Sequence, residues 1–220
     1  MRARSRVRDL IEYSIARLIL TSLQVGPRFI AERLARFYSG LLRLVQPRLR
    51  RIARQNLAMA KLDPEIERGV WRSIARLMVA FARFPSIRKD NVSQWIRYDG
   101  YEHFEEALRR GKGVLFATAH LGNWELSAFA HALMSAPMHI VVRPLDNPFL
   151  DKLVAERRCL SGNSIIEKKD FARGILRALP WSRSPPQVTW SASLNTAAAR
   201  RAGVFSIAGE STATGRDVRG

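Results

Sequence analysis

The chain has 220 residues, and its 37 lysine and arginine side chains outnumber the 19 acidic side chains, which gives a formal net charge of +18. A chain of this length is expected to form a compact domain with a sizeable core. Its single cysteine excludes an intrachain disulfide.

The first 60 residues are predicted to form a basic helical region. They carry 13 arginines and no lysine against three acidic residues, a net charge of +10. Apolar residues recur at helical spacing over two predicted helices, 8–22 and 28–46, and two more helices are predicted at 49–60 and 64–84. Arginines interrupt both apolar stretches, so neither has the roughly 18 uncharged apolar residues that a membrane-spanning helix needs.

Helices with one basic and one apolar face suit an anionic membrane surface, where they lie in the interface. A nucleic-acid-binding arm is disfavoured, because long apolar faces do not fit a solvated arm. A charged outer face over a packed core is a further alternative. We therefore expect a membrane-surface region at residues 1–60 and no nucleic-acid partner.

The following part of the chain alternates between strands and helices. Strands are predicted near 94–98, 113–118, 138–142 and 164–167. Helices are predicted at 101–110, 124–135, 147–160 and 170–179. This order predicts an α/β fold, a layered sheet flanked by helices and preceded by the basic helical region. The expected boundaries are 1–60 for the membrane-surface region, 61–179 for the α/β core and 180–220 for a disordered tail rich in small and polar residues.

The most informative segment is Thr118-Ala-His-Leu-Gly-Asn-Trp-Glu-Leu126. The apolar run before it predicts a covered strand. A helix can begin at Asn123, a favoured N-cap, with Glu125 in its first turn, where a negative charge suits the helix dipole. His120 would then lie on the turn at the carboxyl end of the strand, which is where open α/β sheets bind ligands.

A histidine and a glutamate in this layout have the chemistry of an acyl-transfer site. Imidazole has an unperturbed pKa of about 6.5, so His120 can take a proton from a hydroxyl and pass it to a leaving thiol. Glu125 can fix the tautomer and favour the imidazolium, as the acid does in a Ser-His-Asp triad. The short pattern also fits a purely structural histidine. No metal is expected, because His103 and His131 lack ligand partners at useful spacing and His139 lies in an apolar predicted strand. No cofactor is expected either.

Several blocks, in the same order, resemble the bacterial lipid A biosynthesis acyltransferases of the lauroyl/myristoyl transferase group. The likeness runs from about residue 40 to residue 179. Its blocks are Arg54-Gln-Asn-Leu57, Asp99-Gly-Tyr-Glu-His-Phe-Glu-Glu-Ala-Leu108, Gly111-Lys-Gly-Val-Leu-Phe-Ala-Thr-Ala-His-Leu-Gly-Asn-Trp-Glu125 and Val141-Val-Arg-Pro-Leu-Asp-Asn-Pro-Phe-Leu-Asp151.

The resemblance implies transfer of a fatty acyl chain from a thioester to a hydroxyl of a glycolipid. In the family the donor is usually acyl carrier protein, the acceptor is a phosphorylated lipid A precursor, and the site is on the cytoplasmic face of the inner membrane. A related branch uses acyl-CoA and another glycolipid. The family's catalytic pair corresponds to His120 and Glu125. Because acyl carrier proteins are acidic, the basic region would also steer this donor.

Two further residues are expected to bind substrate. The family's second-block arginine corresponds to Arg143, whose guanidinium suits a phosphate or a developing oxyanion. The alternative for Arg143 is an ion pair with Asp146 or Asp151. Asn123 either contacts substrate or caps the helix, and the cap is favoured.

After Leu179 the chain departs from the family pattern. The segment Pro180-Trp-Ser-Arg-Ser-Pro-Pro186 breaks it, although fragments such as Gly203-Val-Phe205 persist in the right order. We therefore expect a truncated or frame-disturbed C-terminal part. Two hypotheses follow: a working acyltransferase, or a catalytically inactive fragment that binds membrane or carrier protein through its basic helices.

Overall fold

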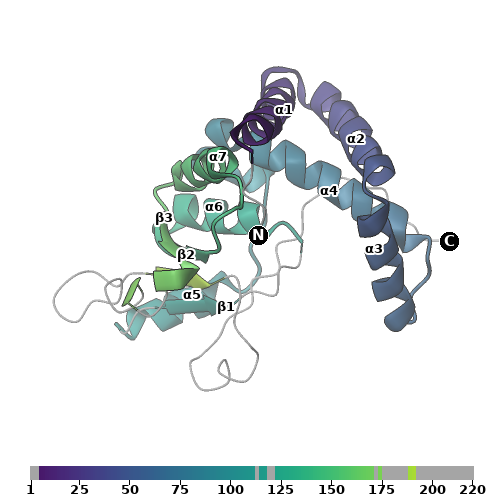
Figure 1. Cartoon of the computed structure of the whole chain (residues 1–220). Helices are drawn as coiled ribbons and strands as arrows, with labels where there is room; N and C mark the ends of the chain where they lie inside the picture. The colour runs from purple at the N-terminus through teal and green to yellow at the C-terminus, as the bar shows by residue number, and fades with distance from the viewer. Residues whose placement is uncertain (1–4, 112–113, 118–121, 171–172, 175–187, 192–220) are drawn as a thin grey trace. The chain divides into compact units, whose positions relative to one another are not determined.

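The computed structural model describes residues 5–111, 114–117, 122–170, 173–174 and 188–191 (Figure 1). The chain divides into two compact units, Met1–Phe84 and Pro85–Gly220. The fourth helix belongs to the first unit, whereas the sequence-based division places its first boundary at residue 60. His120 and most of the expected tail lie outside the described residues.

The first unit contains the four predicted helices. Pro47 is the first residue of α3, a position where its fixed φ angle and missing N–H are tolerated. No helix in the described part of the chain is both long and apolar enough to cross a membrane. The helices are α1 (Arg6–Val25), α2 (Arg28–Val45), α3 (Pro47–Met59) and α4 (Ile66–Ala82).

Small side chains allow the helices of the first unit to pack closely. On α2, Ala31, Ala35 and Ser39 recur every four residues, so they share one face, and all three are buried. The two alanines belong to a core cluster that also includes Ala75 and Val79 of α4. The first unit is therefore held together by a stripe of small residues on α2 facing α4.

The second unit is built around a parallel four-stranded sheet with the order β1-β4-β2-β3. The α/β fold class is thereby confirmed. Its strands are β1 (Val114–Ala117), β2 (Met138–Val142), β3 (Ser164–Glu167) and β4 (Val188–Ser191), and its helices are α5 (Tyr101–Arg109), α6 (Trp124–Met134) and α7 (Pro148–Cys159). Short 3-10 turns are η1 (Phe84–Ser86), η2 (Val92–Gln94) and η3 (Lys168–Asp170).

The predicted strand at 94–98 is wrong. Residues 92–94 form η2, and residues 96–98 belong to no strand. Ile96 is buried, and the hydroxyl of Tyr98 donates to the carbonyl of Ser127 at 2.9 Å. The alternation of inward side chains that indicated a strand therefore comes from a connecting segment packed on α6.

Residues 188–191 form β4 between β1 and β2, at a place where the sequence predicts no element. The expected disorder of the tail therefore does not hold for these four residues. The other residues of the expected tail lie outside the described part, as do most residues of the predicted helix at 170–179.

The core of the second unit joins the sheet to the helices. Phe104 of α5, Phe116 of β1, Ala128 of α6 and Ile140 of β2 are buried in one cluster. The buried side chain of Asn163 crosses the edge of this core: its amide oxygen accepts from the N–H of Met138 at 2.9 Å, and its amide nitrogen donates to the carbonyl of Ala128 at 3.1 Å.

Candidate functional site

The candidate site lies at the carboxyl ends of two parallel strands, β1 and β2. β1 ends at Ala117 and β2 ends at Val142. Because β4 is parallel to both, the carboxyl ends of β1 and β2 lie at the same edge of the sheet. The chain leaves this edge toward α6 after β1 and toward α7 after β2, which is the edge where open α/β sheets bind ligands.

Asparagine side chains cap both helices that follow this edge. The side-chain oxygen of Asn123 accepts from the N–H of Leu126 at 3.1 Å, so Asn123 is the N-cap of α6, as the sequence favours. Asn147 caps α7 in the same way, with N–H groups of Phe149 and Leu150 at 3.0 and 3.3 Å. The alternative role of Asn123 as a substrate contact stays a prediction.

Glu125 lies in the first turn of α6, and its side chain is nearly buried. Arg158, in the last turn of α7, donates to both of its carboxylate oxygens. The Nε atom lies 3.2 Å from Oε1 and 3.0 Å from Oε2, and Nη2 lies 2.5 Å from Oε1. The exposed fractions of the two side chains are 12% for Arg158 and 10% for Glu125, so water screens this ion pair little.

The ring of Trp124 also contacts the guanidinium group of this pair. Trp124 packs against the core cluster of the second unit. The guanidinium carbon of Arg158 lies 5.3 Å from the centroid of its ring, within the range of a cation–π contact. Arg158 is thus positioned by a carboxylate and by an aromatic ring.

The predicted partner of Glu125, His120, lies outside the described residues. The contact between imidazole and carboxylate therefore stays a prediction. Each carboxylate oxygen has two acceptor sites, so a carboxylate that binds one guanidinium retains the capacity for another donor.

Arg143 follows β2 directly at the same sheet edge. Its side chain is 80% exposed, and its Nη2 lies 3.8 Å from Oδ1 of Asp146. Asp151 instead accepts from the backbone N–H of Leu145 at 2.8 Å. A surface ion pair of this length contributes at most about 1 kcal/mol, so it competes weakly with a bound anion. The role of Arg143 in binding substrate stays a prediction.

Arg158 is not among the site residues that the sequence predicts. Its ion-pair partner Glu125 is 33 positions away on another helix, and no local pattern connects the two residues. The available signal was indirect: a carboxylate predicted near a buried strand needs a cationic partner, and a predicted helix ends with adjacent arginines.

His131 is a second buried group of the α6 region. Among the described residues neither ring nitrogen has a hydrogen-bond partner, and the ring lies 4.6 Å from Phe104 and 5.0 Å from Phe116 between centroids. Burial lowers the pKa of His131 from 6.5 to about 4. It is therefore a neutral core residue at neutral pH.

Residues 2–183 match the family described as bacterial lipid A biosynthesis acyltransferase. The match begins well before residue 40, where the resemblance seen in the sequence begins, so it also includes the arginine-rich helices α1 and α2. It covers the segments that contain His120, Glu125, Arg143 and Arg158.

Two curated relatives agree with this match. The chain is 32% identical over 88 residues to a lipid A biosynthesis lauroyltransferase of Escherichia coli, which covers 40% of this chain and 28% of that protein. It is 30% identical over 134 residues to a lipid A biosynthesis acyltransferase of Haemophilus influenzae, which covers 58% of this chain and 42% of that protein. The matched segments thus span less than half of either relative. The family match over residues 2–183 covers most of the chain, and the chain therefore belongs to the bacterial lipid A biosynthesis acyltransferase family.

Proposed function

We propose that the protein transfers a fatty acyl chain from an acyl thioester to a hydroxyl group of a lipid A precursor. The observation that carries this proposal is the place of Glu125: a nearly buried, ion-paired carboxylate in the first turn of the helix that follows β1. The carboxylate lies five positions after His120 in a chain that belongs to this acyltransferase family.

In the proposed reaction His120 acts as the general base. It takes the proton of the acceptor hydroxyl while the hydroxyl oxygen attacks the thioester carbonyl carbon. The carbon–sulfur bond then breaks, and the imidazolium returns the proton to the departing thiolate. An ester and a free thiol result, so no covalent enzyme intermediate is required.

Glu125 orients the imidazole and stabilises its protonated form in this mechanism. Arg158 is then a positioning residue, because it holds both carboxylate oxygens and limits the rotation of the Glu125 side chain. The pair is nearly buried, so the orientation of the carboxylate is set by protein groups.

Arg143 is proposed to bind the acceptor phosphate or the developing oxyanion. Its exposed guanidinium presents a planar fork of donors at the sheet edge that β1 and β2 share. The weak contact with Asp146 leaves this fork accessible.

The proposed location is the cytoplasmic face of the inner membrane, with the first unit in the membrane surface. The support is a pair of exposed apolar stripes, in which large side chains repeat with a helical period along one face of a helix. The stripe of α1 consists of Val7, Ile11, Ile15, Leu18 and Val25, and the stripe of α2 consists of Ile30, Phe37, Leu41 and Leu44. Arginines on the same helices would contact anionic headgroups.

The proposed donor is acyl carrier protein, and the +10 charge of residues 1–60 would attract such an acidic partner. An acyl-CoA donor and another glycolipid acceptor form the alternative within the same chemistry. A transfer assay with each labelled donor and a lipid A precursor distinguishes the two donors.

The mechanism is tested with His120→Ala and Glu125→Gln in the same assay. We expect His120→Ala to lower the rate about a hundredfold or more, the usual contribution of a general base. His103→Ala, a histidine on α5, is the matched control and should leave the rate unchanged. Transfer that persists undiminished in His120→Ala would disprove the assigned role of His120.

The second candidate is a catalytically inactive protein that binds membrane or carrier protein through its basic helices. The exposed stripes of α1 and α2 favour it, because they serve binding without any chemistry. Vesicle binding without transfer from either donor, in the wild type and in His120→Ala alike, would favour this candidate.

A further inference from the structure

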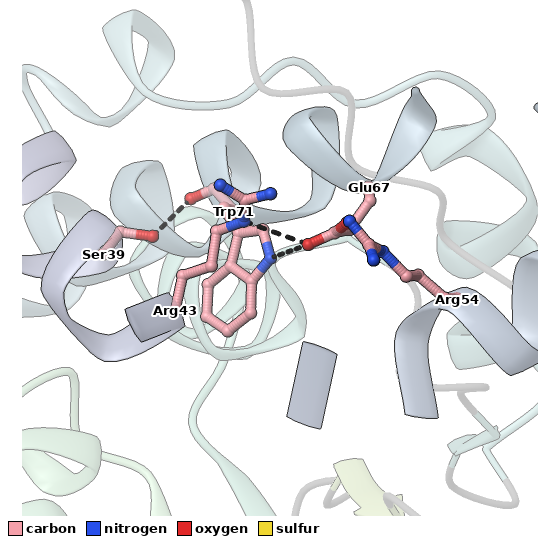
Figure 2. Close-up of polar contacts among 5 residues, drawn as sticks. All are labelled: Ser39, Arg43, Arg54, Glu67 and Trp71. Atoms are coloured by element: carbon pink, nitrogen blue, oxygen red, sulfur yellow. Dashed lines mark hydrogen bonds and ion pairs between the residues drawn. The ribbon is translucent and has the colours of Figure 1, made fainter. Parts of the chain in front are cut away.

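A buried carboxylate in the first unit binds two arginines from two other helices (Figure 2). The side chain of Glu67, near the start of α4, is only 3% exposed. Its Oε1 lies 3.0 Å from Nε of Arg43 on α2, and its Oε2 lies 2.8 Å from Nε of Arg54 on α3. The indole N–H of Trp71 also donates to Oε1, at 3.2 Å.

The helices that carry this cluster are positioned by their packing. Ser39 donates from its hydroxyl to the carbonyl of Trp71 at 2.7 Å, which fixes α2 against α4 (Figure 2). Arg43 follows Ser39 by four residues, so it extends the buried stripe of α2 toward Glu67. The cluster therefore lies where the end of α2, the middle of α3 and the start of α4 meet.

The charges of this cluster do not balance. One carboxylate neutralises one of the two guanidinium groups. Arg50, one turn before Arg54 on the same face of α3, is half-buried and forms no ion pair within the described part of the chain. The hydrogen bond from Arg43 is the largest of the causes that lower the pKa of Glu67 to about 2, so this arrangement stays ionised at neutral pH.

The guanidinium groups of Arg43 and Arg54 are partly exposed to solvent, although the Nε atom of each is hydrogen-bonded to Glu67. The exposed side-chain fraction is 32% for Arg43 and 53% for Arg54. Glu67 contacts each of them through Nε, and a guanidinium has five N–H donors in a fixed fork. The terminal N–H groups of the two arginines remain as donors, and the Glu67 carboxylate sets the spacing between the two guanidinium groups. Several donors in this arrangement suit the several oxygens of a phosphate group.

A purely structural role, in which the arginines only hold the helices together, does not account for the two guanidinium groups around Glu67. One arginine would neutralise Glu67, and Ser39 already ties α2 to α4. The neighbours of Arg43 in the chain, Leu44 and Val45, are 70% and 62% exposed. Exposed apolar side chains beside partly exposed guanidinium groups are typical of a surface that lies at the boundary between acyl chains and headgroups.

We propose that Arg43 and Arg54, positioned by Glu67, bind the phosphate group of an anionic lipid headgroup. The proposal rests on the membrane-surface placement of the first unit. Arg43 and Arg54 supply the donors, and Glu67 is the positioning residue that sets their spacing. This site lies outside the His120–Glu125 segment and concerns attachment to the lipid surface.

Two kinds of vesicle test it with the full-length protein. One contains phosphatidic acid, which presents a phosphate monoester, and the other contains oleate at a matched surface charge; the bulk lipid is phosphatidylcholine in both. Binding is measured by cosedimentation for the wild type and for R43K/R54K. The control is R48K/R51K, which changes two exposed arginines of α3 and also keeps every charge. Melting temperatures confirm that each variant is folded.

We expect R43K/R54K to bind phosphatidic acid vesicles about tenfold more weakly, because lysine lacks the fork of donors. Its binding to oleate vesicles and both results for R48K/R51K should equal those of the wild type. Equal losses on both vesicles, or equal losses in both variants, would overturn the proposal.

Glu67→Gln provides a sharper test, because it adds one unit of positive charge. General electrostatic attraction predicts stronger binding to both vesicles, as expected for the control Glu65→Gln, which changes an exposed glutamate. A positioning role of Glu67 predicts weaker binding to phosphatidic acid. Stronger binding of Glu67→Gln to both vesicles would contradict that role.

Two further outcomes would overturn the lipid site. Wild-type protein that binds neither vesicle overturns both the membrane-surface placement and the lipid site. A melting temperature that rises with inorganic phosphate in the wild type but not in R43K/R54K, together with equal vesicle binding of the two, would assign the site to a soluble phosphate and overturn the lipid assignment.

Discussion

The carboxylate of Glu125 and the guanidinium of Arg158 form an ion pair that joins the first turn of α6 to the last turn of α7. Three hydrogen bonds connect the two groups, and both side chains are about nine-tenths buried. Glu125 therefore has a structural partner besides the proposed catalytic one. A substitution at either position acts on stability as well as on chemistry, and the two effects must be measured separately.

Replacement of Arg158 by methionine should lower the free energy of unfolding by about 3–5 kcal/mol, because it leaves the Glu125 carboxylate buried without a counter-charge. Urea unfolding followed by circular dichroism measures the loss. Arg109→Met, at the exposed end of α5, is the control and should change stability by less than about 0.5 kcal/mol.

Removal of both charges should recover much of this loss. The double variant Glu125→Leu with Arg158→Met leaves no unpaired charge in the pair, so its stability should exceed that of Arg158→Met alone. A double variant that is less stable than Arg158→Met would show that the cost arises from lost packing instead of an uncompensated charge.

His131 should make the folded state sensitive to mild acid. Burial lowers the pKa of His131 to about 4 in the folded protein, whereas the unfolded value is 6.5. The unfolded chain therefore binds the proton first, and stability falls as the pH decreases from about 6.5 to about 4. The full effect of such a shift is about 3 kcal/mol.

The contribution of His131 is isolated by His131→Leu, which cannot titrate. The difference in unfolding free energy between wild type and variant should be constant above about pH 7 and should change in favour of the variant toward pH 4. The groups facing the ring from neighbouring elements are Tyr98, Phe104 and Phe116. A difference that does not vary with pH would contradict a neutral buried imidazole.

Asn163→Ala should destabilise the second unit by about 1–3 kcal/mol, because it leaves the N–H of Met138 and the carbonyl of Ala128 without their partner inside the core. The control is Asn91→Ala, which also loses two hydrogen bonds to the backbone, but in an exposed segment. Urea unfolding should therefore show a larger loss for Asn163→Ala; equal losses would mean that burial does not govern the cost.

Polar substitutions in the exposed stripe of α2 should weaken vesicle binding. Phe37→Gln with Leu41→Gln removes two large side chains that are 64% and 48% exposed, so folding should be little affected. The lost transfer of apolar surface into lipid should lower binding to anionic vesicles about tenfold or more. The control, Leu145→Gln with Leu160→Gln, changes exposed leucines of the second unit. Equal effects of the two double variants would contradict a specific role of α2.

Most elements were predictable because their signals are local. Hydrophobic periodicity and capping residues predict β2 and β3 with their observed bounds, and they predict the bounds of helices α1 to α7 to within three residues. The error at 94–98 has a local cause as well: Ile96 and Tyr98 alternate inward as in a strand, but no neighbouring strand pairs with them.

The sequence by itself determined the α/β class, the cap at Asn123 and the place of Glu125 in the first turn of α6, because each depends on residues close together in the chain. Only the tertiary structure decided that Arg158 binds Glu125, that Arg43 and Arg54 share Glu67, and that β4 lies between β1 and β2. Those relationships join residues 13 or more positions apart, or separate strands of one sheet. Their partners are selected by packing and by the need of buried charges for a counter-charge, and no short sequence pattern encodes that choice.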